Sequence, residues 1–113
     1  MIKIYHNPRC SKSRQTLSLL NENGLEPEIV EYLKNVPSEN EIKELLNLLN
    51  ISAGHLLRKG EQDYKDHVKG KDLSEDQIIK LMTVYPKLIE RPIVVNNKKA
   101  AIGRPPENVL NIL

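Results

Sequence analysis

The order of strand and helix signals constrains the fold of this chain most. Residues 2–5 alternate apolar and polar side chains, which predicts a short strand. Residues 11–23 carry apolar side chains at helical spacing and are followed by Gly24, a typical helix terminator. Residues 29–32 then predict a second strand. A helix between two such strands indicates a parallel, right-handed β-α-β unit.

The middle of the chain predicts helices rather than strands. Two capping boxes begin helices at Ser38 and Ser74, because a Glu or Gln follows each serine three residues later. Shorter helices are expected between them, at residues 52–57 and 63–68. We assign residues 37–90 to this helical block, which Pro86 helps to end since proline cannot continue a helix.

The last part of the chain returns to strands. Residues 91–95 predict a strand with Pro92 near its start, where a missing N–H is tolerated. Two asparagines at positions 96 and 97 indicate a turn, so that residues 99–102 can pair back antiparallel. A final helix begins at Pro105 and Pro106. Its predicted buried stripe is Val109, Leu110 and Leu113.

The complete order is β-α-β, a helical block, and then β-β-α. This order predicts an α/β, thioredoxin-like fold with a helical insertion. We expect residues 1–113 to form a single domain, because an insertion of about fifty residues is too small to bury a core of its own. The core must be built from aliphatic residues and a few tyrosines, since the chain has no Phe and no Trp.

The charge and hydropathy patterns exclude several classes of protein. The formal net charge of +2 is too small to indicate nucleic-acid binding through bulk charge. The first residues show no signal-peptide pattern, and no apolar run in the sequence is long enough to span a bilayer. We therefore expect a cytoplasmic protein without a membrane partner. We also expect a monomer, because no unexplained apolar stripe is present.

Cys10 is the only cysteine in the chain, and its context favours a reactive thiol. It lies between the first predicted strand and the first predicted helix, where backbone N–H groups and the helix dipole favour negative charge. Arg9, Lys12 and Arg14 add positive charge nearby, and His6 is close enough across the loop to contact the sulfur. Such surroundings lower a thiol pKa, so that Cys10 is predicted to be a thiolate nucleophile.

The residues after Cys10 restrict its chemistry. Ser13 stands where thioredoxins have their second cysteine, and a serine cannot resolve a mixed disulfide. It can donate a hydrogen bond to the thiolate, and any adduct on Cys10 must then be resolved by an external thiol. A phosphatase-type C-x5-R site is excluded, because Thr16 occupies the position of the arginine.

Arginines from elsewhere in the chain must therefore hold any anion. Arg91 precedes Pro92, which in thioredoxin-like folds forms a cis peptide bond beside the active-site sulfur. Arg104 is predicted at the same edge of the sheet, and Arg58 belongs to the helical insertion. Guanidinium groups bind tetrahedral oxyanions bidentately and keep their charge at every relevant pH.

The remaining polar residues indicate less specific roles. Asn7 is expected to shape the loop before Cys10. His55 and His67 have no metal-ligand spacing to each other or to Cys10, so the sequence predicts no metal site.

Taken together, these motifs resemble the glutaredoxin-dependent arsenate reductases, the ArsC family. The resemblance is closest to a short-chain branch of that family, and it covers the chain from end to end. The matching segments are residues 4–10 with Ser13 and Arg14, residues 56–59, residues 90–95 and residues 103–105.

The resemblance implies an oxidoreductase in which Cys10 attacks arsenate. Glutathione, as co-substrate, then attacks the arsenic adduct, and glutaredoxin completes the reduction to arsenite. No bound cofactor is implied. The residues implied to support the thiolate are His6 and Ser13, and those implied to bind the oxyanion are Arg58, Arg91 and Arg104. Lys12 replaces a smaller residue of well-known members and should favour the thiolate.

Two other functions are compatible with parts of this pattern. A C-x-x-S thioredoxin-like protein can be a glutathione-dependent thiol-disulfide oxidoreductase, but that reaction does not need three arginines around the sulfur. The chain is also distantly similar to the Spx regulators, which bind RNA polymerase and typically carry a C-x-x-C redox switch. Ser13 removes that switch.

Overall fold

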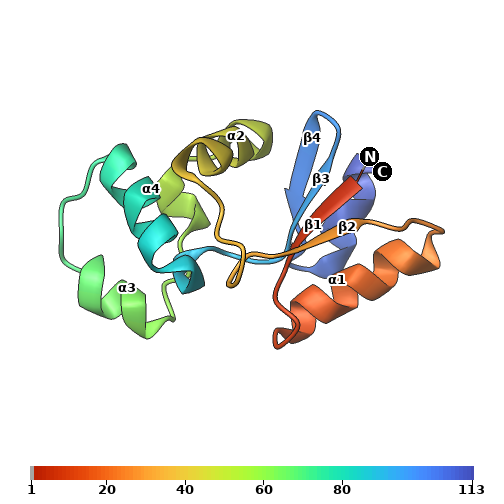
Figure 1. Cartoon of the computed structure of the whole chain (residues 1–113), viewed down its shortest axis with the longest axis horizontal. Helices are drawn as coiled ribbons and strands as arrows, with labels where there is room; N and C mark the ends of the chain where they lie inside the picture. The colour runs from red at the N-terminus through yellow and green to blue at the C-terminus, as the bar shows by residue number, and fades with distance from the viewer. Residues whose placement is uncertain (1) are drawn as a thin grey trace. The chain divides into compact units, whose positions relative to one another are not determined.

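The computed structural model describes residues 2–113, which form two compact units (Figure 1). The first unit combines the chain up to Asn35 with residues 91–113, and the second unit is Val36–Glu90. The bounds of the second unit nearly coincide with the predicted helical block at residues 37–90. That the whole chain forms a single domain stays a prediction.

The first unit is built on a mixed sheet, to which residues 2–113 contribute four strands. The strands are β1 (Ile2–His6), β2 (Glu28–Glu31), β3 (Ile93–Asn96) and β4 (Lys99–Ile102). They lie in the order β2-β1-β3-β4, with β1 and β2 parallel and β3 antiparallel to both of its neighbours. The predicted α/β, thioredoxin-like fold is confirmed.

Two helices pack against this sheet: α1 (Ser11–Glu22) and the 3-10 helix η3 (Pro106–Ile112). Gly24 follows the end of α1, as predicted for a residue that terminates the helix. Its φ of +77° lies in the left-handed region, which glycine adopts readily. The buried side chains between the sheet and the helices are Ile2, Ile4, Leu20, Val94, Val109 and Ile112.

The predicted buried stripe of the last helix is only partly correct. Val109 is fully buried, but Leu110 and Leu113 are 42% and 46% exposed. Pro106 and Ile112 are buried instead. The prediction assumed an α-helix, whereas a 3-10 helix has three residues per turn, so that residues 106, 109 and 112 share one face.

The second unit is helical throughout its regular elements. These are α2 (Glu39–Leu49), η1 (Ala53–Leu56), α3 (Gln62–His67), α4 (Glu75–Val84) and η2 (Pro86–Leu88). Both predicted capping boxes are formed, at Ser38 and at Ser74. Within residues 2–113, no helix combines the length and apolar character that a membrane span requires.

The strand register brings three distant segments to one end of the sheet. Tyr5, near the end of β1, pairs with Ile93, the first residue of β3, and Ile93 pairs with Ile102, the last residue of β4. The segments after β1, before β3 and after β4 therefore leave the sheet at the same end. These segments carry Cys10, Arg91 and Arg104.

Candidate active site

Cys10 is the N-cap residue of α1 and is partly buried. Its carbonyl oxygen accepts the first hydrogen bond of the helix, from the backbone N–H of Arg14 at 3.0 Å. The backbone N–H groups of Lys12 and Ser13, which the helix itself cannot use, lower the pKa of the Cys10 thiol. The start of the helix thus stabilises negative charge on Cys10, as the sequence predicts.

Two arginines from the far end of the chain also reach this sulfur. Nη1 of Arg104 lies 3.8 Å from Sγ of Cys10 and donates to the carbonyl oxygen of Arg91 at 3.1 Å. The side chain of Arg91 acts on the same sulfur, because it also lowers the pKa of the Cys10 thiol. The peptide bonds Arg91–Pro92 and Arg104–Pro105 are both cis, the first as predicted. Two of the three predicted arginines therefore lie at Cys10.

These contacts act on the pKa of the thiol in opposite directions. Burial has the largest effect and raises the pKa of Cys10. The hydrogen bonds from the Ser13 N–H, from Arg91, from the Lys12 N–H and from Arg104 outweigh it and hold the pKa below its ordinary value. The thiolate, which is the nucleophilic form, is accordingly more abundant at neutral pH than in free cysteine.

Lys12 contributes to this effect through its backbone N–H. That contribution does not depend on the side chain, because every residue except proline carries the same donor. The predicted influence of the Lys12 ammonium group stays a prediction.

The loop before Cys10 is held by a small polar network. The hydroxyl of Ser13 lies 2.6 Å from Nδ1 of His6 and accepts a hydrogen bond from the backbone N–H of Asn7 at 3.0 Å. Asn7 in turn accepts from the N–H of Arg9 with its side chain and from the N–H of Cys10 with its carbonyl oxygen, each at 3.0 Å. Asn7 thus shapes the loop.

This network corrects one detail of the sequence prediction. The hydroxyl of Ser13 was expected to donate to the sulfur, and His6 was expected to contact it. In the structure the two side chains hydrogen-bond to each other, and it is the backbone N–H of Ser13 that lowers the pKa of Cys10. Ser13 and His6 therefore act on the thiolate through the position of the loop.

His6 is buried, and its environment favours the neutral ring. Burial is the largest cause and lowers the pKa of His6; the Glu31 carboxylate opposes this effect, and the Arg14 guanidinium adds to it. The net pKa lies below the usual value. His6 is thus a neutral hydrogen-bonding partner of Ser13 at neutral pH.

Arg58 belongs to the second unit, where it is paired with two carboxylates. Its Nε lies 3.3 Å from Glu61 and its Nη1 lies 3.2 Å from Glu90. Its backbone N–H donates to the carbonyl oxygen of Leu88 at 2.8 Å. Oxyanion binding by Arg58 stays a prediction, and these two glutamates would compete with an anion for its guanidinium.

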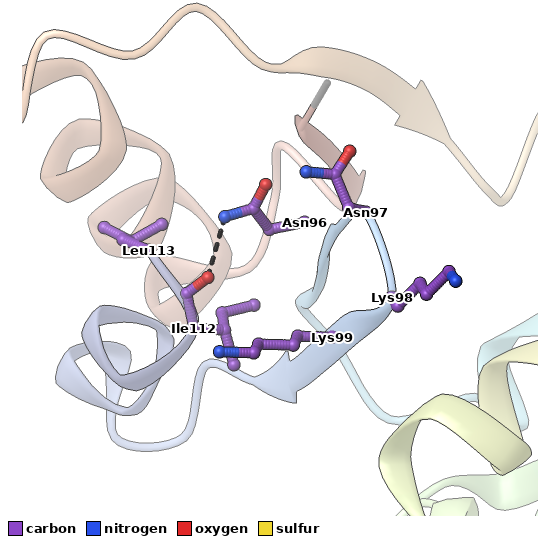
Figure 2. A pocket seen from close by; sticks show the side chains of 6 residues that line it. All are labelled: Asn96, Asn97, Lys98, Lys99, Ile112 and Leu113. Carbon is purple, nitrogen blue, oxygen red and sulfur yellow. Dashed lines mark hydrogen bonds between the residues drawn. The ribbon is translucent and has the colours of Figure 1, made fainter.

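A pocket of about 370 Å³ lies elsewhere in the first unit (Figure 2). It is lined by the turn between β3 and β4, residues 96–99, and by Ile112 and Leu113. The side chain of Asn96 donates to the carbonyl oxygen of Ile112 at 2.7 Å. Because Asn96 pairs with Ile2, the first residue of β1, this pocket is at the opposite end of the sheet from Cys10. It is therefore separate from the thiolate site.

The second unit also brings three possible metal ligands together. The ligand atoms of Asp63, Asp66 and His67 lie within 4.8 Å of one another on α3, a grouping that the sequence analysis did not predict. Asp66 accepts a hydrogen bond from the side chain of Gln62, and the His67 ring stacks on Tyr85. Asp66 and His67 therefore already have partners within the protein, and their positions do not require a metal ion.

Comparison with known proteins gives consistent matches over the whole chain. The family model described as the ArsC family matches residues 5–112. An uncharacterised protein of Escherichia coli K12, YfgD, is 54% identical, covering 99% of this chain and 96% of its own. An arsenate reductase of Neisseria meningitidis is 45% identical, covering 99% and 97%. The structure of an arsenate reductase from Vibrio cholerae superposes with a TM-score of 0.96 at 47% identity, covering 99% and 97%.

Proposed function

Because this chain belongs to the ArsC family, we propose that it is a cytoplasmic arsenate reductase in which the Cys10 thiolate attacks arsenate. The observation that carries the proposal is that the Arg104 guanidinium lies 3.8 Å from the Cys10 sulfur and that the Arg91 side chain also lowers the pKa of this thiol. Exchange with disulfides uses a thiolate but does not require positive charge that binds an anionic substrate. A tetrahedral oxyanion that must approach a negative sulfur needs positive charge at that place.

In the proposed first step, the Cys10 sulfur forms a bond to arsenic, and an arsenate oxygen leaves as water after taking up protons. Arg91 and Arg104 neutralise the charges of the two anions, which would otherwise repel each other. Arg58 is the third proposed ligand of the oxyanion, in agreement with the family resemblance. To bind arsenate it must exchange at least part of its pairing with Glu61 and Glu90.

Reduction of arsenic from the +5 to the +3 state requires two electrons, and this chain has no second cysteine to supply a thiol. We propose that the glutathione thiol attacks the arsenic of the Cys10 adduct and displaces a second arsenic oxygen as water. A glutaredoxin thiol then attacks the glutathione sulfur, and the bond between this sulfur and arsenic breaks with its electron pair left on arsenic. The two thiols are oxidised to a mixed disulfide, the two electrons reduce arsenic, and arsenite leaves after hydrolysis of its bond to Cys10. No bound cofactor takes part in this scheme.

The test is a coupled assay that follows NADPH consumption with arsenate, glutathione, glutaredoxin and glutathione reductase. We expect arsenate-dependent turnover in the wild type and none in Cys10→Ser, because a serine hydroxyl is not ionised near pH 7. Ser18→Ala, a change at an exposed position of the same helix, should keep full activity and serves as the matched control. Omitting glutathione and glutaredoxin one at a time identifies the thiols that are required.

Turnover of a glutathione mixed disulfide without any arsenate-dependent rate would contradict the proposal and favour a thiol-disulfide oxidoreductase. Capture of RNA polymerase by the wild-type protein, without either activity, would instead favour an Spx-like regulator. Phosphate has nearly the shape and charge of arsenate but is not reduced by thiols. It should therefore inhibit competitively without supporting NADPH consumption.

A further inference from the structure

Gly103, the residue before Arg104, lies where three segments of the first unit meet: α1, the residues before β3 and the residues after β4. It is buried, and its backbone N–H donates to the carbonyl oxygen of Pro92 at 2.9 Å. A Cβ atom at this position would lie 2.5 Å from Oγ1 of Thr16 and 2.8 Å from Cγ of Pro92. Neither distance is possible without movement, so only glycine fits here.

The two neighbours of Gly103 cannot easily make room. Thr16 is fully buried, and its hydroxyl donates to the carbonyl oxygen of Lys12 at 2.8 Å, which fixes its orientation on α1. The same hydroxyl lies 3.5 Å from the carbonyl oxygen of Gly103. Pro92 is buried, and because its ring closes on its own backbone, Cγ can move only by the small shift of a change in ring pucker. A Cβ must therefore displace the backbone of Gly103 or one of these two segments.

Each of the three segments carries one charged group of the site. Thr16 belongs to the helix that begins at Cys10, Pro92 follows Arg91, and Gly103 precedes Arg104. The spacing at Gly103 therefore helps to set the spacing between the sulfur and the two guanidinium groups, because Thr16 is within two helix turns of Cys10 and Pro92 and Gly103 are each one residue from an arginine.

We propose that Gly103 is a positioning residue of the active site: its missing side chain lets α1, Pro92 and the end of β4 approach closely enough for Arg91 and Arg104 to reach the Cys10 sulfur. This inference deepens the proposed function, because it explains how the positive charge of the oxyanion site is held in place. Gly103 itself contacts neither the sulfur nor the anion.

The test measures the rate of Cys10 alkylation by iodoacetamide against pH, which gives the thiol pKa without arsenate or any partner protein. The variants are Gly103→Ala, Thr16→Ala and the two combined, and Arg104→Ala provides the shift for complete loss of one guanidinium. Gly54→Ala is the matched control, since a Cβ on Gly54 would have no atom within 4 Å and its φ is not positive.

We expect Gly103→Ala to raise the pKa of Cys10 by about one unit, which corresponds to roughly tenfold slower alkylation below the midpoint. The effect of Gly103→Ala on the pKa should be smaller when Thr16 is already alanine, because removing the threonine side chain relieves two of the three close contacts. The pKa difference between the combined variant and Thr16→Ala should therefore be smaller than that between Gly103→Ala and the wild type. Gly54→Ala should leave the profile unchanged.

A folded Gly103→Ala protein with the alkylation profile of the wild type would overturn the inference. It would also be overturned if Gly103→Ala raised the pKa of Cys10 equally in the presence of Thr16 and of Thr16→Ala. If Gly103→Ala does not fold, the combined variant decides: a pKa above that of Thr16→Ala supports the inference, and an equal pKa overturns it. A combined variant that fails to fold also overturns it, since relief at Thr16 would then have no effect. Because none of these outcomes depends on arsenate turnover, they are distinguishable from failure of the proposed function.

Discussion

Nη1 of Arg104 lies 3.8 Å from Sγ of Cys10, although 94 positions separate the two residues in the sequence. The pKa of the Cys10 thiol is therefore lowered by donors of two kinds: local backbone N–H groups at the start of α1, and the distant side chains of Arg91 and Arg104. The local donors belong to the helix and are present whatever side chains follow Cys10. The distant ones can be removed singly by substitution, so that their effect on the thiol can be measured.

Removal of either arginine should raise the pKa of Cys10. In Arg91→Ala and Arg104→Ala one hydrogen bond to the thiolate is lost, while the burial that raises the pKa remains. We expect slower alkylation by iodoacetamide at pH values below the midpoint and no change well above it, where the thiol is fully ionised. Both variants should also use arsenate less efficiently.

Arg9→Ala is the matched control for this experiment. It removes the same charge from a residue next to Cys10, but the Arg9 side chain is exposed and is not among the groups that shift the pKa of Cys10. Its alkylation profile should stay close to that of the wild type. Equal shifts in Arg9→Ala and Arg104→Ala would show that bulk charge, rather than contact with the sulfur, lowers the pKa.

Ser13→Ala should affect stability more than the thiol. The variant keeps the backbone N–H that bonds the sulfur but leaves the buried His6 ring and the buried N–H of Asn7 without their partner. We expect a loss of about 1–3 kcal/mol in the free energy of unfolding, measured by urea titration. Ser18→Ala, exposed on the same helix, should change it by less than about 0.5 kcal/mol. A Cys10 pKa shift as large as that of Arg104→Ala would instead support a direct hydroxyl bond to the sulfur.

The buried His6 ring should make stability depend on pH. Its folded-state pKa is lowered, chiefly by burial, from an unfolded value of about 6.5. The neutral His6 ring therefore makes its full contribution to the free energy of unfolding above that pH. This contribution is lost as the pH falls toward and through the folded-state pKa, because in this range the unfolded chain binds a proton that the folded chain does not. The free energy of unfolding should fall as the pH drops below about 6.5.

His6→Gln should flatten this part of the stability profile. His55→Gln is the control, because His55 is exposed and its ring bonds only to the nearby Ser52 hydroxyl among the contacts of the described chain. Its profile should run parallel to that of the wild type. Parallel profiles for His6→Gln and the wild type would mean that His6 is not the group responsible.

Much of this architecture follows from the order of the elements. A strand, a helix and a parallel strand place Cys10 at the start of the helix, and the antiparallel pair that follows brings Arg91 and Arg104 to the same end of the sheet. Both placements depend only on which strand ends meet, and strand ends can be predicted from hydrophobic alternation and from the turn at residues 96 and 97.

Details that depend on side-chain direction could not be predicted in this way. The spacing of Ser13 to Cys10 is compatible with a hydroxyl bond to the sulfur, but the loop folds back so that His6 and Asn7 bond that hydroxyl instead. The steric role of Gly103 depends on Thr16, eighty-seven positions away. Such a pairing leaves no local pattern in a single sequence.

Two variants of the last helix can distinguish the α-helix that the sequence pattern predicts from the 3-10 helix η3 of the structure. Val109 and Leu110 are adjacent and both were expected to be buried, but Val109 is fully buried in the core cluster while Leu110 is 42% exposed. Because the 3-10 helix η3 buries Val109, Val109→Ala should lower the free energy of unfolding by about 2 kcal/mol, through lost burial and a cavity. Leu110→Ala should change it by no more than about 0.5 kcal/mol, although it removes the larger side chain. Urea unfolding of the two variants decides the matter: a larger loss for Leu110→Ala would mean that the helix is wound as an α-helix, with the originally predicted stripe facing the core.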